Sequence, residues 1–225
     1  MKRTTPILIV VVFFFFANQI AVAAPVDPSM MSRLVLLASK DERRLNELDR
    51  AYLDAYTILR DENPCSGIFG GPAAIEALNE LVRTLRPAYL EKHIAVRMSG
   101  ETTMFRNAAN GFTFRMFQKA EINMTGSFYR GNTPLDRRVP QVAQYQPNTR
   151  QTRVALLLHE LGHLVRGEDK KWVLSDDGHD LNRSIKNTEY VVDACRDEIE
   201  HATRLTVAQQ LEQPLTTVAQ MATQP

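Results

Sequence analysis

The sequence predicts an α+β fold, mostly helical, with a small antiparallel sheet that precedes a buried helix. Three patterns lead to this prediction. Apolar residues recur at three- and four-residue spacing between residues 32 and 60 and again between 75 and 85, as in amphipathic helices. Residues 111–117 alternate in the period of a strand. The run Leu156–Val165 is apolar on nearly all sides, which is typical of a helix inside a core.

The first helix is predicted over Ser32–Arg60, and Asn63-Pro64 stops it. Its apolar face consists of Leu45, Leu48, Tyr52, Ala55, Tyr56 and Leu59. A glycine-rich loop follows. The second helix then presents Ile75, Leu78, Leu81, Val82 and Leu85 on one face, and Pro87 ends it.

The sheet is predicted between residues 90 and 130. Its candidate strands are His93–Met98, Gly111–Phe117, Glu121–Met124 and Ser127–Tyr129, the last two separated by a kink or bulge at Gly126. These short segments lie just before the apolar helix. We therefore expect the sheet to be mostly antiparallel and to lie beside that helix.

The apolar helix is predicted to begin at a cap, either Asn148 or Thr149, and to run to about Val165. A glycine inside a helix costs up to about 1 kcal/mol relative to alanine, so Gly162 indicates a close backbone contact.

A last long helix is expected to begin at Ser184 or Asn187. Its apolar face consists of Val191, Val192, Cys195 and Ile199. Residues from Gln209 onward are polar. We predict one domain over residues 24–210 and a frayed tail over 211–225.

The first 23 residues have the pattern of a secretory signal peptide. Lys2 and Arg3 precede an apolar run from Ile7 to Phe16, and Ala-Val-Ala ends at Ala23, where cleavage is expected. The run is shorter than the ~20 apolar residues of a membrane-spanning helix. We therefore expect a secreted or periplasmic protein with no membrane association after cleavage.

The charge balance and the cysteines agree with export. The chain has 27 Lys and Arg against 26 Asp and Glu, which predicts no nucleic-acid or anionic-membrane partner. Cys65 and Cys195 are the only cysteines, an even number in an exported chain. A disulfide between them is expected, and the loop-entropy model gives about 4–5 kcal/mol for a loop of this size.

His159 and His163 stand four residues apart in the apolar helix, so they share one face. Two imidazoles at this spacing can bind one zinc ion, and Glu160 is placed to act as general base on a metal-bound water. The motif resembles that of the zincin metallopeptidases. This resemblance implies a zinc-dependent hydrolase that cleaves a peptide or protein substrate, and an edge strand that binds the substrate. We expect that edge at Ile122–Phe128.

A catalytic zinc needs a third protein ligand. The sequence offers Asp177 in an acidic loop, His179 beside it, Glu189 on the last helix and Asp169 six residues after the second histidine. A Glu189 and Asp193 pair resembles the gluzincin branch. Asp169 resembles the metzincin arrangement, but Arg166 occupies the position where that branch has glycine.

A second resemblance favours Asp177. The chain is similar to a family of uncharacterised exported bacterial proteins that combine an Ile-Asn-x-x-Gly-x-Phe segment, the histidine motif, an Asp-Gly turn, Asn-Thr and a cysteine. Here these pieces are residues 122–128, 159–163, 177–178, Asn187-Thr188 and Cys195. That family implies no established reaction.

Other roles remain open at this stage. Tyr129, Tyr190 and His201 are possible oxyanion stabilisers, although each is an ordinary packing or surface residue more often. The alternative functions are a non-catalytic zinc-binding interaction domain and a metal-free envelope protein held together by its disulfide. The sequence does not determine the oligomeric state.

Overall fold

The computed structural model describes residues 46–135, 138–167, 169–178 and 180–212. This part of the chain combines helices with a three-stranded sheet, which confirms the α+β prediction. The predicted signal peptide lies outside the described residues, as do residues 213–225 of the predicted tail. Within the described residues, no helix has both the length and the apolar character that a membrane span requires.

The N-terminal helices begin at side-chain caps. Helix α2 (Glu47–Arg60) starts where the Asn46 side chain accepts a hydrogen bond from the Asp49 amide, and the rest of the predicted segment before it is not described. Helix α3 (Pro64–Ile68) has a capping box between Asn63 and Ser66. The short helix η2 (Gly71–Ala73) leads into α4 (Ala74–Thr84), which ends close to the predicted position.

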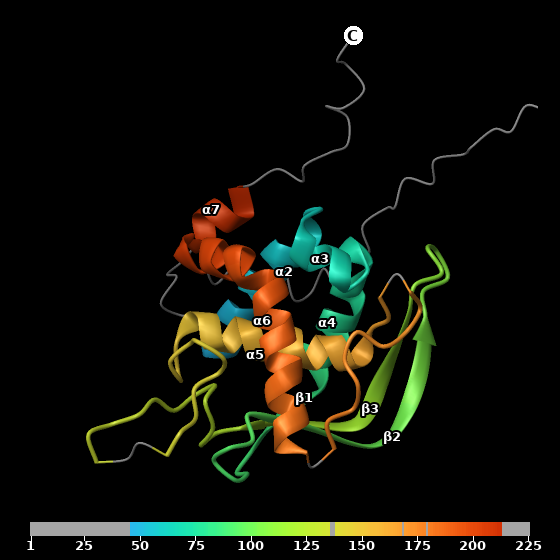
Figure 1. Ribbon diagram of the computed structural model, residues 1–225. Coiled ribbons are helices and arrows are strands. Elements are labelled where there is room, and N and C mark those ends of the chain that lie inside the picture. The colour runs from blue at the N-terminus through green and yellow to red at the C-terminus, as the bar shows by residue number, and fades with distance from the viewer. Residues whose placement is uncertain (1–45, 136–137, 168, 179, 213–225) are drawn as a thin grey trace, which may run out of the picture.

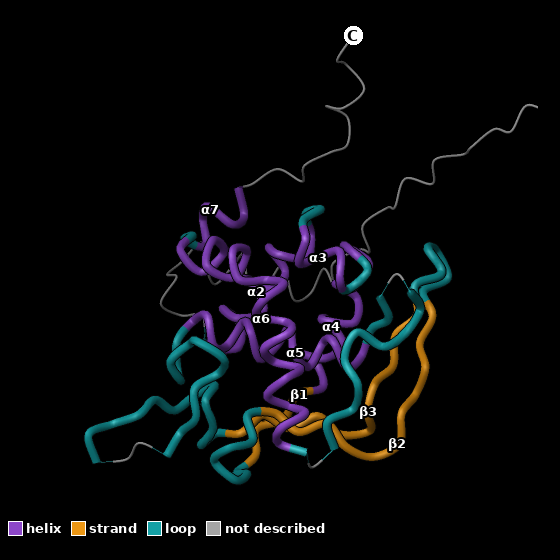
Figure 2. The backbone as a smooth tube through the Cα atoms, in the orientation of Figure 1, coloured by secondary structure: helices purple, strands orange, loops and turns teal. Residues whose placement is uncertain are grey.

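The sheet contains β1 (Leu85–Ala88), β2 (Val96–Arg106) and β3 (Thr113–Asn123) in the order β1-β3-β2. Strands β2 and β3 form an antiparallel hairpin with a register shift between Ser99 and Thr102. Strand β1 pairs with β3 in parallel, and its Pro87 lies at an edge where a missing amide is tolerated. Figure 2 shows the three strands together below the helices.

Two strand predictions were wrong. Residues 127–129 form a turn rather than a strand. The segment Ile122–Phe128 is not an edge strand, because β3 is the central strand and ends at Asn123. The free edge beside the predicted site belongs to β2 instead.

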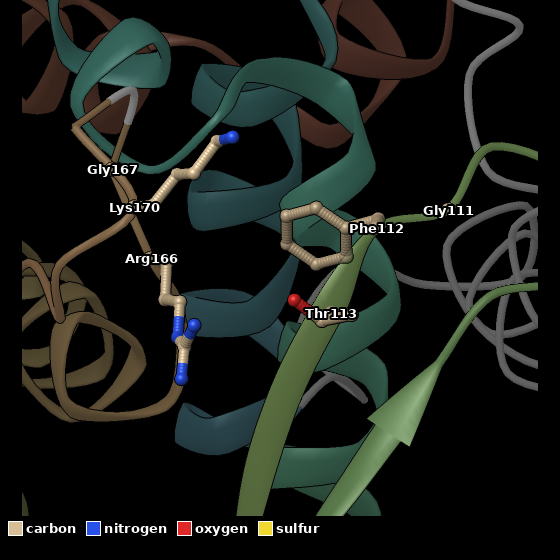
Figure 3. A pocket seen from close by; sticks show the side chains of 6 residues that line it. All are labelled: Gly111, Phe112, Thr113, Arg166, Gly167 and Lys170. Atoms are coloured by element: carbon tan, nitrogen blue, oxygen red, sulfur yellow. The ribbon is translucent and has the colours of Figure 1, made fainter.

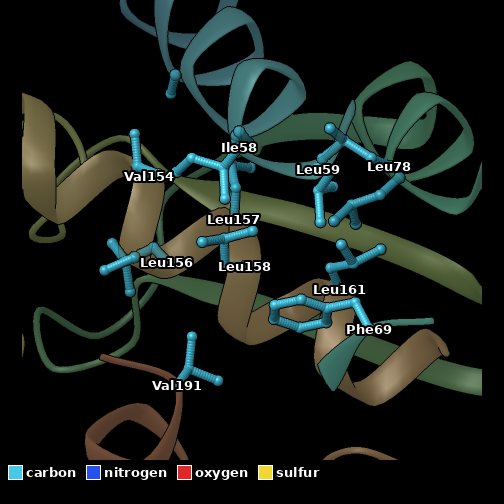
Figure 4. Packing of buried hydrophobic residues seen from close by; sticks show 14 of the residues in the cluster. Ile58, Leu59, Phe69, Leu78, Val154, Leu156, Leu157, Leu158, Leu161 and Val191 are labelled. Atoms are coloured by element: carbon cyan, nitrogen blue, oxygen red, sulfur yellow. The ribbon is translucent and has the colours of Figure 1, made fainter. Parts of the chain in front are cut away.

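Helix α5 (Arg150–Leu164) carries the histidine motif and is capped by Thr149, one of the two predicted caps. It packs against α2, α4 and α6. Figure 4 shows its Leu157, Leu158 and Leu161 among side chains of those neighbouring segments. Since leucines on several sides of α5 are buried, most of its surface lies within the core.

Helix α6 (Leu181–Arg204) crosses α5 in Figure 1 and begins before the predicted caps. The Asp180 side chain accepts from the Arg183 amide and caps it, whereas Ser184 and Asn187 lie inside the helix. Helix α7 (Val207–Glu212) includes residues 211 and 212, the first two of the predicted frayed tail, so these two residues are helical. The helix is held by Gln210, which is buried and whose side-chain amide donates to Asp54.

The predicted disulfide is present. Cys65 in α3 and Cys195 in α6 form it with a Cα–Cα distance of 4.6 Å, and both residues are fully buried. The bond fastens the C-terminal half of α6 to the helical core. The N-terminal half of the same helix is left to line the site.

Candidate metal centre

His159 and His163 lie one turn apart on α5 and turn their rings toward the same point. Their Nε2 atoms are 3.1 Å apart, and the two residues are 3% and 4% exposed. Gly162 allows the loop that follows α5 to cross close to the helix, because a Cβ there would come within 2.7 Å of the Leu174 side chain. The backbone amide of Leu174 also donates to the Gly162 carbonyl. This is the close contact that the glycine predicted.

The loop that crosses Gly162 brings Asp177 to the histidines. Its Oδ2 lies 3.1 Å from His159 Nε2 and 3.4 Å from His163 Nε2. Ligand atoms about 2.0–2.1 Å from a tetrahedral zinc are about 3.3–3.4 Å apart, so all three separations are close to those of a shared ion. The structure thus brings together both histidines and the favoured third candidate.

Glu160 adds a second carboxylate to the site. His159, Glu160 and His163 form a buried group whose potential ligand atoms lie within 4.8 Å of one another, so this group could hold a metal ion. However, the Glu160 Oε1 is 4.0 Å from His159 Nε2, farther than the Asp177 oxygen. Of the two carboxylates, that of Asp177 is therefore the nearer to His159 Nε2.

Two residues of α6 hold the ligands in place. The Thr188 hydroxyl donates to the Ser184 carbonyl, so its oxygen accepts from Nδ1–H of His159 at 3.0 Å. This leaves Nε2 of His159 unprotonated and directed at the shared point. The Asn187 side-chain amide donates to the other oxygen of Asp177 and to the Ser175 carbonyl.

Sequence reasoning did not identify these two roles. The Asn-Thr pair was part of the second resemblance, and this was the available signal for it. Apolar spacing predicts that α6 buries one face. It does not predict which turn of α6 faces the histidines and Asp177.

The arrangement fits a cation. An unprotonated imidazole nitrogen of His159, a second imidazole nitrogen and a carboxylate oxygen face one another at hydrogen-bond distances. Their lone pairs repel unless a proton or a metal ion lies between them. Nδ1 of His163 is buried and has no hydrogen-bond partner among the described residues, so one ligand lacks the outer contact that His159 has.

The electrostatics reflect this close grouping. Burial raises the pKa of Glu160, and the neighbouring histidines oppose that shift only in part. Burial alone would raise the pKa of Asp177, but its contacts with the two histidines outweigh burial and hold the pKa of this carboxyl well below its usual range. Burial opposes protonation of His163, yet its contact with Asp177 leaves its pKa raised.

His159, His163 and Asp177 line a cleft of about 510 Å³. Its walls are the first residues of β2, the N-terminal half of α6 and the segment 140–143, with α5 between them. Asn123 N donates to Ala95 O, so residues 95 and 123 are a hydrogen-bonded pair of the antiparallel ladder. By alternation, the backbone groups of Val96 and Met98 point away from β3, and no described segment pairs with them.

The Ile-Asn-x-x-Gly-x-Phe segment supports this wall. The fully buried Asn123 side chain donates to the carbonyls of Glu91 and Ile94 and accepts from the Leu90 amide. A Cβ at Gly126 would come within 2.8 Å of the Ile94 carbonyl. The segment predicted as a substrate-binding edge therefore does not line the edge itself. It holds in place the loop that leads into β2.

The other ligand candidates have no described contact with the two histidines. His179 is outside the described residues. Glu189 is exposed at the border of the cleft, and none of the described contacts of the histidines involves it. Asp169 is exposed and pairs with Lys171 at 3.3 Å.

The oxyanion candidates do not line the cleft. Tyr129 is half-buried and packs on Phe128, with ring centroids 4.8 Å apart, and burial raises its pKa. Tyr190 is 51% exposed on α6, and His201 is exposed near the end of that helix.

A second pocket of about 270 Å³ lies between the start of β3 and the turn after α5. Figure 3 shows that the side chains of Arg166 and Lys170 point away from each other there. The Arg166 guanidinium lies 4.6 Å from the centre of the Trp172 ring. Among the described residues that line this pocket there is no histidine or carboxylate.

Comparisons of the chain with protein-family models, with curated proteins and with solved structures found no match.

Proposed function

We propose that the protein is an exported zinc-dependent hydrolase, a zincin-like metallopeptidase that cleaves peptide bonds. The observation that carries this proposal is the triangle of His159 Nε2, His163 Nε2 and Asp177 Oδ2, with sides of 3.1, 3.1 and 3.4 Å. A structural zinc site has four protein ligands, whereas three protein ligands beside a cleft are typical of a catalytic one. A zinc ion held there would supply a Lewis acid and a water with a pKa near ~7.

Glu160 is the proton carrier in this proposal. Its side chain is 9% exposed and lies beside the ligand triangle, with Oε1 4.0 Å from His159 Nε2. It would accept a proton from the attacking water and then donate it to the nitrogen of the leaving amine.

The free edge of β2 supports a peptide as the substrate. The outward backbone groups of Val96 and Met98 can pair with an extended chain, which would then cross the cleft beside the histidines. Such pairing reads the backbone of a substrate and not its sequence. This explains why a hydrolase with this cleft would act on peptide bonds in particular.

Two variants test the proposal. Glu160→Gln should retain stoichiometric zinc and lose hydrolysis of a peptide library by about 10²-fold or more, because the general base is removed. Glu189→Gln, a matched change at the border of the cleft, should retain zinc and should reduce hydrolysis far less than Glu160→Gln does. A Glu160→Gln variant as active as the wild type would refute the role of Glu160. Absence of zinc from the purified wild type would refute the metal centre.

Asp177→Ala should lose zinc while Glu189→Ala retains it, because only Asp177 contacts both histidines. Metal content by elemental analysis and folding by circular dichroism are measured on the same samples. If Glu189→Ala loses the metal and Asp177→Ala does not, the ligand assignment is wrong.

A further inference from the structure

Helix α6 exposes two large aliphatic side chains inside the cleft. Leu181 and Ile185 are 50% and 46% exposed, and both line the cleft. They are four residues apart, so they stand one above the other on one face of the helix. Thr188, which holds the His159 ring, follows on that face less than one turn later. Exposed aliphatic residues that gather beside a metal centre indicate a surface for an apolar ligand group.

The opposite wall is also apolar. Val96 and Met98 are cross-strand partners of the buried Ile122 and Ala120, so their side chains lie on the face of the sheet that is turned toward the core. Both residues line the cleft. An extended chain paired with β2 would therefore have aliphatic side chains of this wall on one side and those of α6 on the other.

The border of the cleft is acidic. Asp176, Asp180 and Glu189 are exposed there. The arginine of the lining, Arg97, is paired with Glu121 on β3 at 2.9 Å, so its charge is already balanced. Asp180 is paired with Arg183 at 3.8 Å, so its charge is balanced as well. With Asp177 and a divalent cation contributing one net positive charge and Glu160 one negative, the border carboxylates of Asp176 and Glu189 leave the cleft negative. A positively charged ligand is favoured by this field.

We propose that the cleft selects extended peptide segments that carry a large apolar residue, which packs against Leu181 and Ile185, flanked by lysine or arginine. This inference names the substrate class of the hydrolase proposed above and rests on that function. The apolar residue supplies most of the selectivity, because the aliphatic surface is covered only when it is bound. The flanking cations supply a smaller, salt-dependent preference.

The test separates binding from hydrolysis. Binding of fluorescent peptides to zinc-loaded Glu160→Gln protein is measured by anisotropy, and hydrolysis of the same peptides is measured with the wild type. The peptides differ only in a central Leu or Ala and in flanking Lys or Glu. The Leu peptide should bind about tenfold or more tightly than the Ala peptide. The Lys peptide should bind more tightly than the Glu peptide, and added salt should reduce that difference.

Variants of α6 locate the preference. In the Glu160→Gln background, the double substitution Leu181→Ser with Ile185→Ser should bring the ratio of the Kd values for the Ala and Leu peptides close to one. Tyr190→Ser should leave it unchanged, because Tyr190 is equally exposed on the same helix but does not line the cleft. Thermal unfolding of each variant checks that the exposed substitutions leave the fold intact.

The outcomes are distinct. Selective binding without hydrolysis would refute the hydrolase and retain the binding preference. Hydrolysis of all four peptides at equal rates, with equal binding, would refute the preference and retain the hydrolase. Failure of every peptide to bind overturns the inference, and so does an equal loss of selectivity in the Tyr190→Ser control.

Discussion

Replacing Thr188 by valine removes one hydroxyl while keeping the shape of the side chain, and it tests the outer support of the metal centre. The hydroxyl oxygen accepts from Nδ1–H of His159 at 3.0 Å, in a position where the ring is almost fully buried. Without that acceptor, the neutral imidazole gains by moving its proton to Nε2. That nitrogen is then no longer free to bind a metal ion.

The magnitude follows from the contact that is lost. A buried N–H without a partner costs about 1–3 kcal/mol, and the loss of an outer contact to a metal-binding histidine typically weakens metal affinity by about 10–100-fold. Since tenfold corresponds to about 1.4 kcal/mol, the two estimates agree. We therefore expect the Kd for zinc of Thr188→Val to rise by about 10–100-fold.

The assay is competition for zinc with a chromophoric chelator at fixed pH. The matched control is Thr203→Val, because Thr203 lies on the same helix and its hydroxyl donates to the carbonyl four residues earlier, as that of Thr188 does. Thr203 has no described contact with the histidines. An unchanged zinc Kd in Thr188→Val, or an equal rise in both variants, would refute the reasoning.

The remaining predictions concern the framework of the site. Arg150→Met should lower the free energy of unfolding by up to about 3–5 kcal/mol, because the fully buried Asp54 carboxylate loses its two hydrogen bonds to the Arg150 guanidinium and keeps Arg50 only at 4.0 Å. Arg204→Met, which breaks an exposed ion pair, should cost no more than about 1 kcal/mol, and urea unfolding compares the two. Gly162→Ala should destabilise the protein by about 1–3 kcal/mol, because its Cβ would overlap the Leu174 side chain, and a thermal midpoint equal to that of the wild type would contradict this.

The sequence predicted those parts of the fold that depend on local pattern. The Thr149 cap, the buried α5 and the facing histidines follow from residue spacing within one helix. The disulfide followed from an even cysteine count together with the leader pattern. In each case the signal lies in a few neighbouring residues or in a count, so no knowledge of the tertiary arrangement was needed.

The errors concern tertiary arrangement. Strand β1 contains Pro87, which reads as a helix stop, and it pairs in parallel with a strand far along the chain. That pairing makes β3 the central strand, so the free edge beside the site is β2 and not the predicted Ile122–Phe128. Helix α6 begins earlier than predicted, because Asp180 of the acidic loop caps it. The acidic residues of this loop had suggested metal ligands and not a helix cap.

Helix α6 links the stability of the fold to the chemistry of the site. Its C-terminal half buries one face in the core and is fastened through Cys195 to Cys65, whereas its N-terminal half lines the cleft. Asn187 and Thr188 lie in the N-terminal half, about two turns before Cys195, and contact Asp177 and His159. Ligands held from such a position keep their geometry without a bound ion. This accounts for a triangle of donor atoms already at metal-binding distances, and it predicts that zinc binding needs little rearrangement of the chain.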